Sequence, residues 1–135
     1  MTDEQGNSVS LTGVWHGLYA GGGARGHVSF VATLLETASF VSGATHEPRA
    51  VGGMPGETLF ASLMGNREVR AVRFTKSYDA ADENYSVVEY EGTLSGDGTE
   101  IEGRWTIPSN CSGTFLMIRS SRTETARSRK QTVDA

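Results

Sequence analysis

A short segment in the middle of the chain combines an amine and a phenol in a pattern that could do chemistry. In the stretch 72–78, apolar residues alternate with polar ones, which predicts a strand with one apolar face. Lys76 and Tyr78 share the parity of Phe74, so we expect a charged group and a phenolic group at one end of that face. These two side chains are suited to acid–base chemistry or to orienting a ligand.

A second pair of ionisable residues, His46 and Glu47, lies at the end of another expected strand. An imidazole and a carboxylate could act as a general base and its orienting group. Neighbours on a strand face opposite sides, so the pair forms no dyad by itself and acts only if other groups converge on it. His16 and His27 lack the helical spacing of zinc ligands, and Cys111 has no neighbouring cysteine. We therefore expect no metal and no cofactor.

Two further patterns were considered for catalysis or nucleotide binding. The glycine-rich run 21–26 satisfies G-x-G-x-x-G, but a dinucleotide site needs a helix directly after it. The following segment, 27–36, carries three β-branched residues and no capping residue, and it predicts a strand. The run is better explained as a flexible hairpin loop. Cys111 could serve a covalent hydrolase, but the sequence has no G-x-S-x-G elbow, and we assign no catalytic residue.

Composition sets the scale of the protein and the function classes to expect. The chain has 135 residues, 17 glycines, one cysteine and a net charge of −4, which favours a single domain and disfavours nucleic-acid binding. Apolar runs fall far short of the about 20 residues of a membrane helix, so no membrane partner is expected. The segment 1–10 lacks the features of a signal peptide, which predicts a cytoplasmic protein. We expect a flexible segment at 1–10, one domain at 11–119 and a polar, basic tail at 120–135.

Alternating apolar and polar residues between turn-forming residues predict an all-β fold. The expected strands are 13–20, 27–36, 40–47, 58–65, 68–78, 85–94, 100–107 and 112–119. Eight short strands with short connections suggest a meander, and such a sheet removes its exposed edges by closing. The prediction is an eight-stranded antiparallel up-and-down β-barrel, with glycines 17, 92, 103 and 113 where strands bend or pack closely.

The segment 11–15, Leu-Thr-Gly-Val-Trp, contains a G-x-W motif at the start of the first expected strand. It resembles the opening signature of the calycins, the lipocalin and avidin barrels. The segments 41–47, 72–78, 90–94 and 101–105 are similar to avidin strands in order and approximate spacing. The resemblance covers about residues 11 to 119 and implies an avidin-like or lipocalin-like barrel.

Within this resemblance, Trp15 corresponds to the packing tryptophan of the family. The positions that line the biotin pocket in avidins fall on Phe74, Ser86, Val88, Tyr90 and Trp105. Two departures weaken biotin recognition. Gly17 stands where avidins place a polar residue, and Val88 replaces a hydroxyl. No late aspartate matches the one that binds the ureido nitrogens, so the expected ligand is not biotin.

The resulting functional hypothesis is a bacterial-type barrel that binds an apolar or aromatic small molecule. Its expected ligand-binding residues are Trp15, Tyr19, Phe30, His46, Phe74, Lys76, Tyr78, Ser86, Tyr90, Trp105 and Phe115. One alternative is a barrel enzyme of the cyclase or isomerase kind that uses an acid or base in the cavity, with Glu47 among its candidate groups. The other is an interaction protein with a filled barrel. A homodimer or homotetramer is the assembly to test for.

Overall fold

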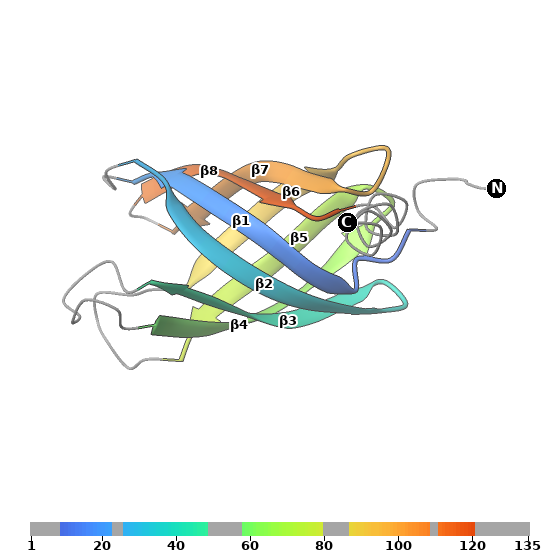
Figure 1. The fold of residues 1–135 in the computed structure, drawn as a ribbon, viewed down its shortest axis with the longest axis horizontal. Helices are drawn as coiled ribbons and strands as arrows, with labels where there is room; N and C mark the ends of the chain where they lie inside the picture. The colour runs from blue at the N-terminus through green and yellow to red at the C-terminus, as the bar shows by residue number, and fades with distance from the viewer. Residues whose placement is uncertain (1–8, 23–25, 49–57, 80–86, 109–110, 121–135) are drawn as a thin grey trace, which may run out of the picture.

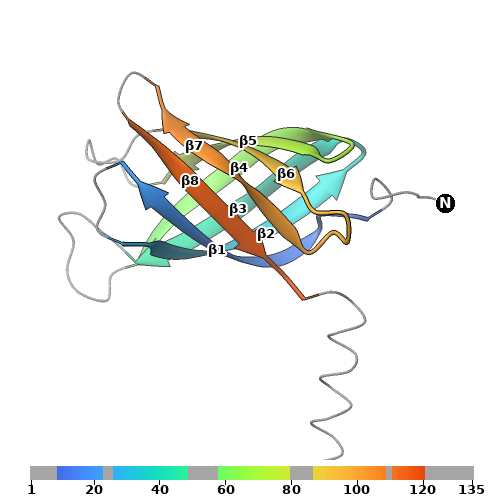
Figure 2. The ribbon, with the colours of Figure 1, turned by 90° about the horizontal axis from the view of Figure 1, so that it is seen from above.

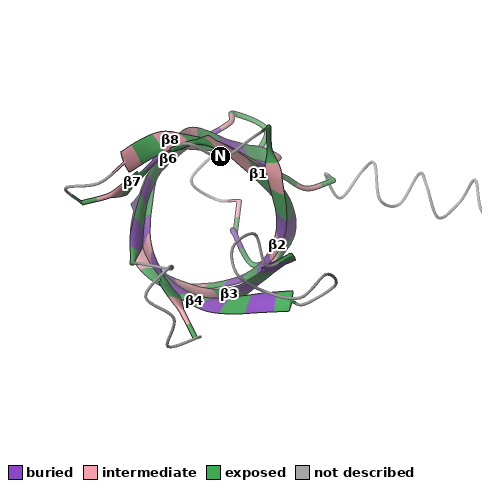
Figure 3. Ribbon diagram, turned by 90° about the vertical axis from the view of Figure 1, so that its left-hand side faces the viewer, coloured by how far each residue is buried: buried purple, intermediate pink, exposed green. Residues whose placement is uncertain are grey.

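The computed structural model describes residues 9–22, 26–48, 58–79, 87–108 and 111–120. Its strands are β1 (Gly13–Gly21), β2 (Val28–Thr37), β3 (Phe40–Pro48), β4 (Thr58–Glu68), β5 (Ala71–Tyr78), β6 (Val88–Leu94), β7 (Glu100–Ile107) and β8 (Cys111–Ile118). Each strand pairs antiparallel with the next, and β8 pairs with β1 (Figures 1 and 2). Viewed along its axis, the sheet forms a complete ring (Figure 3). The predicted eight-stranded antiparallel up-and-down barrel is confirmed.

The predicted strand limits agree with the structure to within about three residues. Differences of three residues occur at the start of β6 and at the β4–β5 hairpin, where β4 continues to Glu68 and β5 begins at Ala71. The turn is therefore Val69-Arg70, and Val69 adopts a φ of 57°. A positive φ is disfavoured for a β-branched residue, and glycine is the residue that usually marks such a turn. Neither turn residue is glycine, so the sequence does not indicate a turn at this place.

The two ends of the barrel differ. At one end lie the short β2–β3, β4–β5 and β6–β7 turns together with residues 9–12, and we call it the closed end (Figure 1). At the other end lie the β1–β2, β3–β4, β5–β6 and β7–β8 connections, and we call it the loop end. Residues 23–25, 49–57, 80–86 and 109–110 of these connections, and the termini 1–8 and 121–135, lie outside the described residues.

Buried apolar side chains from all eight strands meet inside the barrel as one core. The strand alternation predicted from the sequence is confirmed here. The buried residues on alternate strand positions include Trp15, Phe30, Ala32, Leu34, Val72, Phe74, Val88, Tyr90, Ile101, Trp105, Phe115 and Met117. A Cβ atom at Gly17 would overlap the ring of Phe30, and one at Gly103 would overlap the carbonyl oxygen of Glu91. These two glycines allow the close contacts that a small, curved sheet requires.

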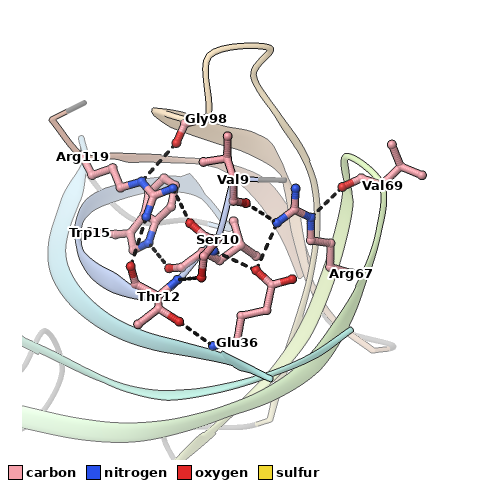
Figure 4. A network of polar contacts seen from close by, with 10 residues as sticks. Val9, Ser10, Thr12, Trp15, Glu36, Arg67, Val69, Gly98 and Arg119 are labelled. Atoms are coloured by element: carbon pink, nitrogen blue, oxygen red, sulfur yellow. Dashed lines mark hydrogen bonds and ion pairs between the residues drawn. The ribbon is translucent and has the colours of Figure 1, made fainter. Parts of the chain in front are cut away.

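The closed end is sealed by a polar network around Trp15 (Figure 4). The indole Nε1 donates to the carbonyl of Leu11 at 2.9 Å, and the Arg119 guanidinium lies 4.3 Å from the centre of the Trp15 ring. Arg119 also donates to the carbonyls of Ser10, Thr12 and Gly98 at 2.6, 3.2 and 3.0 Å. Arg119 directly follows β8. Its cation–π contact with Trp15 and its hydrogen bonds to carbonyl oxygens therefore join the N-terminal segment to the end of β8. Trp15 was expected from the sequence as a packing residue, whereas Arg119 carried no signal that distinguished it from the other arginines.

A second arginine completes this network. Arg67 donates to Glu36 at 3.0 Å and to the carbonyls of Val9 and Val69 at 2.6 Å each. Glu36 in turn accepts from the backbone N–H of Leu11 at 2.8 Å. These contacts fix residues 9–12 across the closed end, so Val9 and Ser10 belong structurally with the barrel. The remainder of the predicted flexible segment, and nearly all of the predicted tail, lies outside the described residues.

Candidate functional site

A lysine and a glutamate form an ion pair inside the barrel, near the loop end. Glu47 is the penultimate residue of β3, and Lys76 lies two residues before the end of β5. Lys76 Nζ is 2.7 Å from Glu47 Oε1, and the two side chains are 1% and 0% exposed. Burying two charges is costly unless they are paired and hydrogen-bonded, so this site is polar in a place where apolar packing would be simpler.

Tyrosine phenols supply the remaining hydrogen bonds of the pair. Tyr19 donates to Glu47 Oε2 at 2.6 Å, and Tyr78 donates to Glu47 Oε1 at 3.2 Å. Lys76 Nζ also donates to the phenol oxygen of Tyr90 at 3.4 Å. The carboxylate is thus held by the lysine and two phenols, which fixes its orientation. The five side chains come from β1, β3, β5 and β6 and are called the lysine cluster below.

The lysine ammonium is also enclosed by aromatic rings. Nζ lies 5.2 Å from the centre of the Tyr19 ring, 5.0 Å from that of Phe30, 4.9 Å from that of Tyr78 and 5.6 Å from that of Tyr90. Each distance is short enough for a cation–π interaction. The rings exclude water from the amine and still stabilise its charged form.

Burial changes the proton affinities of the lysine cluster. Burial lowers the pKa of Lys76 below its ordinary value of 10.5, and the neighbouring Glu47 carboxylate only partly offsets this effect. Burial, together with the charge of Glu47, raises the pKa of Tyr78 and that of Tyr90. The phenols therefore remain protonated donors at neutral pH, while the amine loses its proton more readily than a lysine in water.

A buried hydroxyl near the cluster lacks a partner. Thr45 precedes Glu47 by two residues on β3, so both side chains point inward. Its Oγ1 is buried and makes no hydrogen bond to any residue that the structure describes. Ala32 and Ala61 are its register neighbours on β2 and β4. A buried hydroxyl without a partner, placed between two small side chains, can hydrogen-bond to a water molecule or to a polar atom of a ligand.

The interior between this cluster and the closed end is filled with aromatic side chains. Phe74 stacks on Tyr90 with ring centres 5.0 Å apart, and Tyr90 meets Phe115 edge-on at 4.9 Å. Trp105 packs edge-on against Tyr19 at 6.1 Å, and its Nε1 donates to the carbonyl of Ala20 at 3.0 Å. The contacts of Phe74, Tyr90 and Phe115 fill the middle of the barrel, and the contact of Trp105 with Tyr19 lies toward the loop end.

Exposure inside the barrel rises toward the loop end. Trp15, Leu94 and Met117 at the closed end are 0% exposed, whereas Trp105 is 6% exposed. Partly buried side chains then pack on the core at the loop end, namely Tyr19, Tyr78, Ile107 and Cys111. Among the described residues, Lys76 and Glu47 therefore lie deeper in the barrel than Tyr19 and Tyr78.

The structure gathers most of the predicted site residues but separates others. Those that lie together inside the barrel toward the loop end are Tyr19, Phe30, Phe74, Lys76, Tyr78, Tyr90, Trp105 and Phe115. Trp15 is buried at the closed end beneath Arg119. Ser86 lies outside the described residues. Thr45 was not singled out from the sequence, although its inward parity with Glu47 was a usable signal.

His46, one of the expected ligand-binding residues, does not lie in the barrel interior. It is exposed on the outer face, with its ring 6.2 Å from that of Phe60, because strand alternation directs it away from the side that Glu47 faces. Glu47, not His46, is the member of this pair that joins the lysine cluster. His46 lines an outer groove of about 560 Å³ together with His16, Leu18 and Ile118.

Within the described ranges, no three His, Cys, Asp or Glu side chains gather closely enough to hold a metal ion. The part of the chain that the structure describes contains no helix with the length and apolar character needed to cross a bilayer. Comparison with models of known protein families, with curated proteins and with solved structures found no significant match.

Proposed function

We propose that this barrel binds a small apolar or aromatic molecule at its loop end. The observation that carries the proposal is the arrangement of the interior there. Partly buried aromatic rings lie over a fully buried, oriented pair of charges. Such a site combines apolar contact area with a few convergent polar groups, as small-molecule sites commonly do.

The same arrangement indicates what the ligand should look like. The rings of Tyr19, Tyr78 and Trp105 suit a planar apolar body, and the lysine cluster suits one polar group at its end. Burying about 200 Å² of apolar ligand surface would contribute about 5 kcal/mol before the costs of association. The polar end group would then select among ligands of similar size.

The calycin resemblance and the exclusion of biotin are part of this proposal. A closed eight-stranded meander with G-x-W on its first strand is the architecture that the resemblance implies. The ring of Phe30 occupies the space beside Gly17, where avidins place a polar residue. Val88 is buried and offers no hydroxyl. These positions support an apolar ligand over biotin.

The test uses 8-anilinonaphthalene-1-sulfonate (ANS), whose fluorescence rises in apolar sites. We expect saturable binding, displaced by 2-naphthalenemethanol and weakened at least about tenfold by Trp105→Ala, in line with the loss of one aromatic contact. Leu18→Ala is the control, because Leu18 lines the outer groove instead of the barrel interior. Loss of binding in Leu18→Ala with retention in Trp105→Ala would place the site on the outer face and overturn the proposal. Absence of saturable binding and of thermal stabilisation would also overturn it.

An acid–base enzyme of the cyclase or isomerase kind is the second candidate. The lysine cluster favours it, because Lys76 and Tyr78 lie inside the barrel with shifted pKa values. Such an enzyme would turn over its ligand, whereas a binding protein returns it unchanged. Recovery of the bound molecule from the protein and its identification by mass spectrometry distinguish the two.

A further inference from the structure

The chain uses lysine sparingly. It contains ten arginines and two lysines, Lys76 and Lys130. Three described cations at the closed end, Arg67, Arg70 and Arg119, are arginines bound to carbonyl oxygens. An arginine keeps its charge at any ordinary pH, whereas a buried lysine can lose its proton and become a nucleophile. Placing one of two lysines in the barrel interior therefore introduces a reactivity that an arginine there could not supply.

The surroundings of Lys76 match what an amine needs to react with a carbonyl group. Glu47 Oε1 lies 2.7 Å from Nζ and can accept a proton from it. The phenol of Tyr78 donates a hydrogen bond in the same cluster, and the rings around Nζ exclude bulk water. We propose that Lys76 binds an aldehyde or ketone covalently as an imine. This inference rests on the proposed function, because the carbonyl compound must first enter the loop end.

The reaction balances without any further reagent. The nitrogen lone pair of Lys76 attacks the carbonyl carbon, a C–N bond forms, and the π electrons of C=O move to oxygen. Glu47 takes a proton from nitrogen and passes it to that oxygen, giving a carbinolamine. The second N–H proton then leaves with the hydroxyl group as water while the C=N bond forms. Both protons of the neutral amine end on the released water, and nothing is oxidised or reduced.

The site also favours the product once it has formed. The neutral imine can take up a proton from solvent, and the resulting positive charge at the lysine nitrogen lies beside the Glu47 carboxylate and the four aromatic rings. Burial excludes the water that hydrolyses imines. Burial also lowers the pKa of Lys76, which increases the fraction of neutral amine at pH 7.

Access to Nζ is through the partly buried rings of the cluster. Tyr19 and Tyr78 pack at the edge of the core, whereas Lys76 is fully buried. The Tyr78 phenol makes the longer of the two phenol–carboxylate hydrogen bonds, 3.2 Å against 2.6 Å. A ligand of the proposed planar shape would take the place of the Tyr78 ring above the amine and bring its carbonyl group to Nζ.

The experiment uses the full chain, 2-naphthaldehyde and sodium cyanoborohydride, which reduces the imine to a stable amine. Intact mass and peptide mapping then locate the adduct on Lys76, on Lys130 or on the terminal amine. We expect Lys76 to be modified at least about tenfold faster than Nα-acetyl-lysine at pH 7, because each unit by which an amine pKa falls gives about ten times more neutral amine. The rate at Lys76 should saturate with aldehyde concentration, and urea should abolish the preference.

The pH dependence distinguishes a reactive amine from one that is merely buried. The rate at Lys76 should reach half its maximum at a lower pH than that of Nα-acetyl-lysine. Glu47→Gln removes the charge that favours protonated lysine, so the half-maximum should move to still lower pH. The maximal rate should fall at the same time, because the proton acceptor is lost. A purely structural role for Glu47 would not combine a shift of the half-maximum to lower pH, which means more neutral amine, with a fall in the maximal rate.

The outcomes separate the inference from the proposed function. The alcohol 2-naphthalenemethanol cannot form an imine, so its displacement of ANS reports binding alone. Displacement by the alcohol together with no adduct on Lys76 would overturn the imine and leave the binding function intact. An adduct confined to Lys130 or to the terminal amine would overturn it equally. Failure of both molecules to bind would remove the function and the inference together.

Discussion

The ion pair between Lys76 and Glu47 predicts a large and specific loss of stability when one partner is removed. Lys76→Met keeps the length and the apolar stem of the side chain but removes the ammonium that lies 2.7 Å from Glu47. The carboxylate is 0% exposed, so it keeps its phenol donors but loses its counter-charge. Breaking a buried pair in this way costs about 3–5 kcal/mol, which is much of the 5–15 kcal/mol that holds a typical domain together.

The double variant Lys76→Met/Glu47→Gln should recover most of this loss. Its amide oxygen can accept the hydrogen bond from Tyr19, its NH2 group can donate to the phenol oxygen of Tyr78, and no buried charge remains. We expect the double variant to be about 2–3 kcal/mol more stable than Lys76→Met alone, which gives a coupling energy well above that of independent sites. Urea unfolding of the wild type, both single variants and the double variant, followed by tryptophan fluorescence, measures it.

The wild type, the two single variants and the double variant also test the directions in which burial shifts the pKa values of Lys76, Tyr78 and Tyr90. Because the pKa of Lys76 is lowered in the folded state, the unfolded chain binds more protons up to pH 10.5, and stability rises with pH across that window. The wild type should therefore gain stability relative to the double variant as the pH rises toward 10.5. Above about pH 10 the raised pKa values of Tyr78 and Tyr90 act oppositely in all four, because only the unfolded chain loses those phenol protons.

Two results would refute this reasoning. One is a free energy of unfolding for Lys76→Met within about 1 kcal/mol of the wild-type value, because a buried carboxylate without its cation should destabilise the fold by more than that. The other is additivity, in which the double variant loses the sum of the two single losses. Either would mean that solvent reaches the pair and screens it.

Three further predictions concern stability, each measured by urea unfolding. Gly103→Ala should lower the free energy of unfolding by about 1–3 kcal/mol, because its Cβ would overlap a backbone carbonyl of the adjacent strand. Gly96→Ala, with open space around its Cβ, should lower it by less than about 1 kcal/mol. Equal losses for the two variants would contradict the role of close packing at Gly103. Arg119→Ala should lower the free energy of unfolding by about 2–3 kcal/mol, because it loses its contacts with the Trp15 indole and with carbonyl oxygens. Arg73→Ala should lower it by less than about 1 kcal/mol, because the exposed ion pair of Arg73 is screened by solvent. A larger loss in Arg73→Ala than in Arg119→Ala would exclude a stabilising role for the closed-end network. Thr45→Val should raise the free energy of unfolding by about 1 kcal/mol in the absence of ligand, because it removes a buried hydroxyl without a partner among the described residues. A loss of about 1 kcal/mol would instead show that the hydroxyl is hydrogen-bonded in solution.

Much of the fold could be predicted because strand alternation is a local property of the backbone. Successive side chains point to opposite faces, so the parity of Phe74 alone indicated that Lys76 and Tyr78 face inward. The β4–β5 turn was placed too early because Val69 adopts a conformation that its residue type disfavours. Here the pairing of whole strands outweighs the preference of one residue.

The sequence by itself determined the eight strands, their inward faces and the presence of one amine in the barrel interior. Only the tertiary structure decided which acid meets that amine. Lys76 and Glu47 are 29 residues apart, and their contact depends on the register and tilt of strands that close into a ring. The same closure brings Tyr19 from β1 and Tyr90 from β6 to the pair. Parity is fixed by each strand's own backbone, whereas convergence across the barrel depends on all eight strands together.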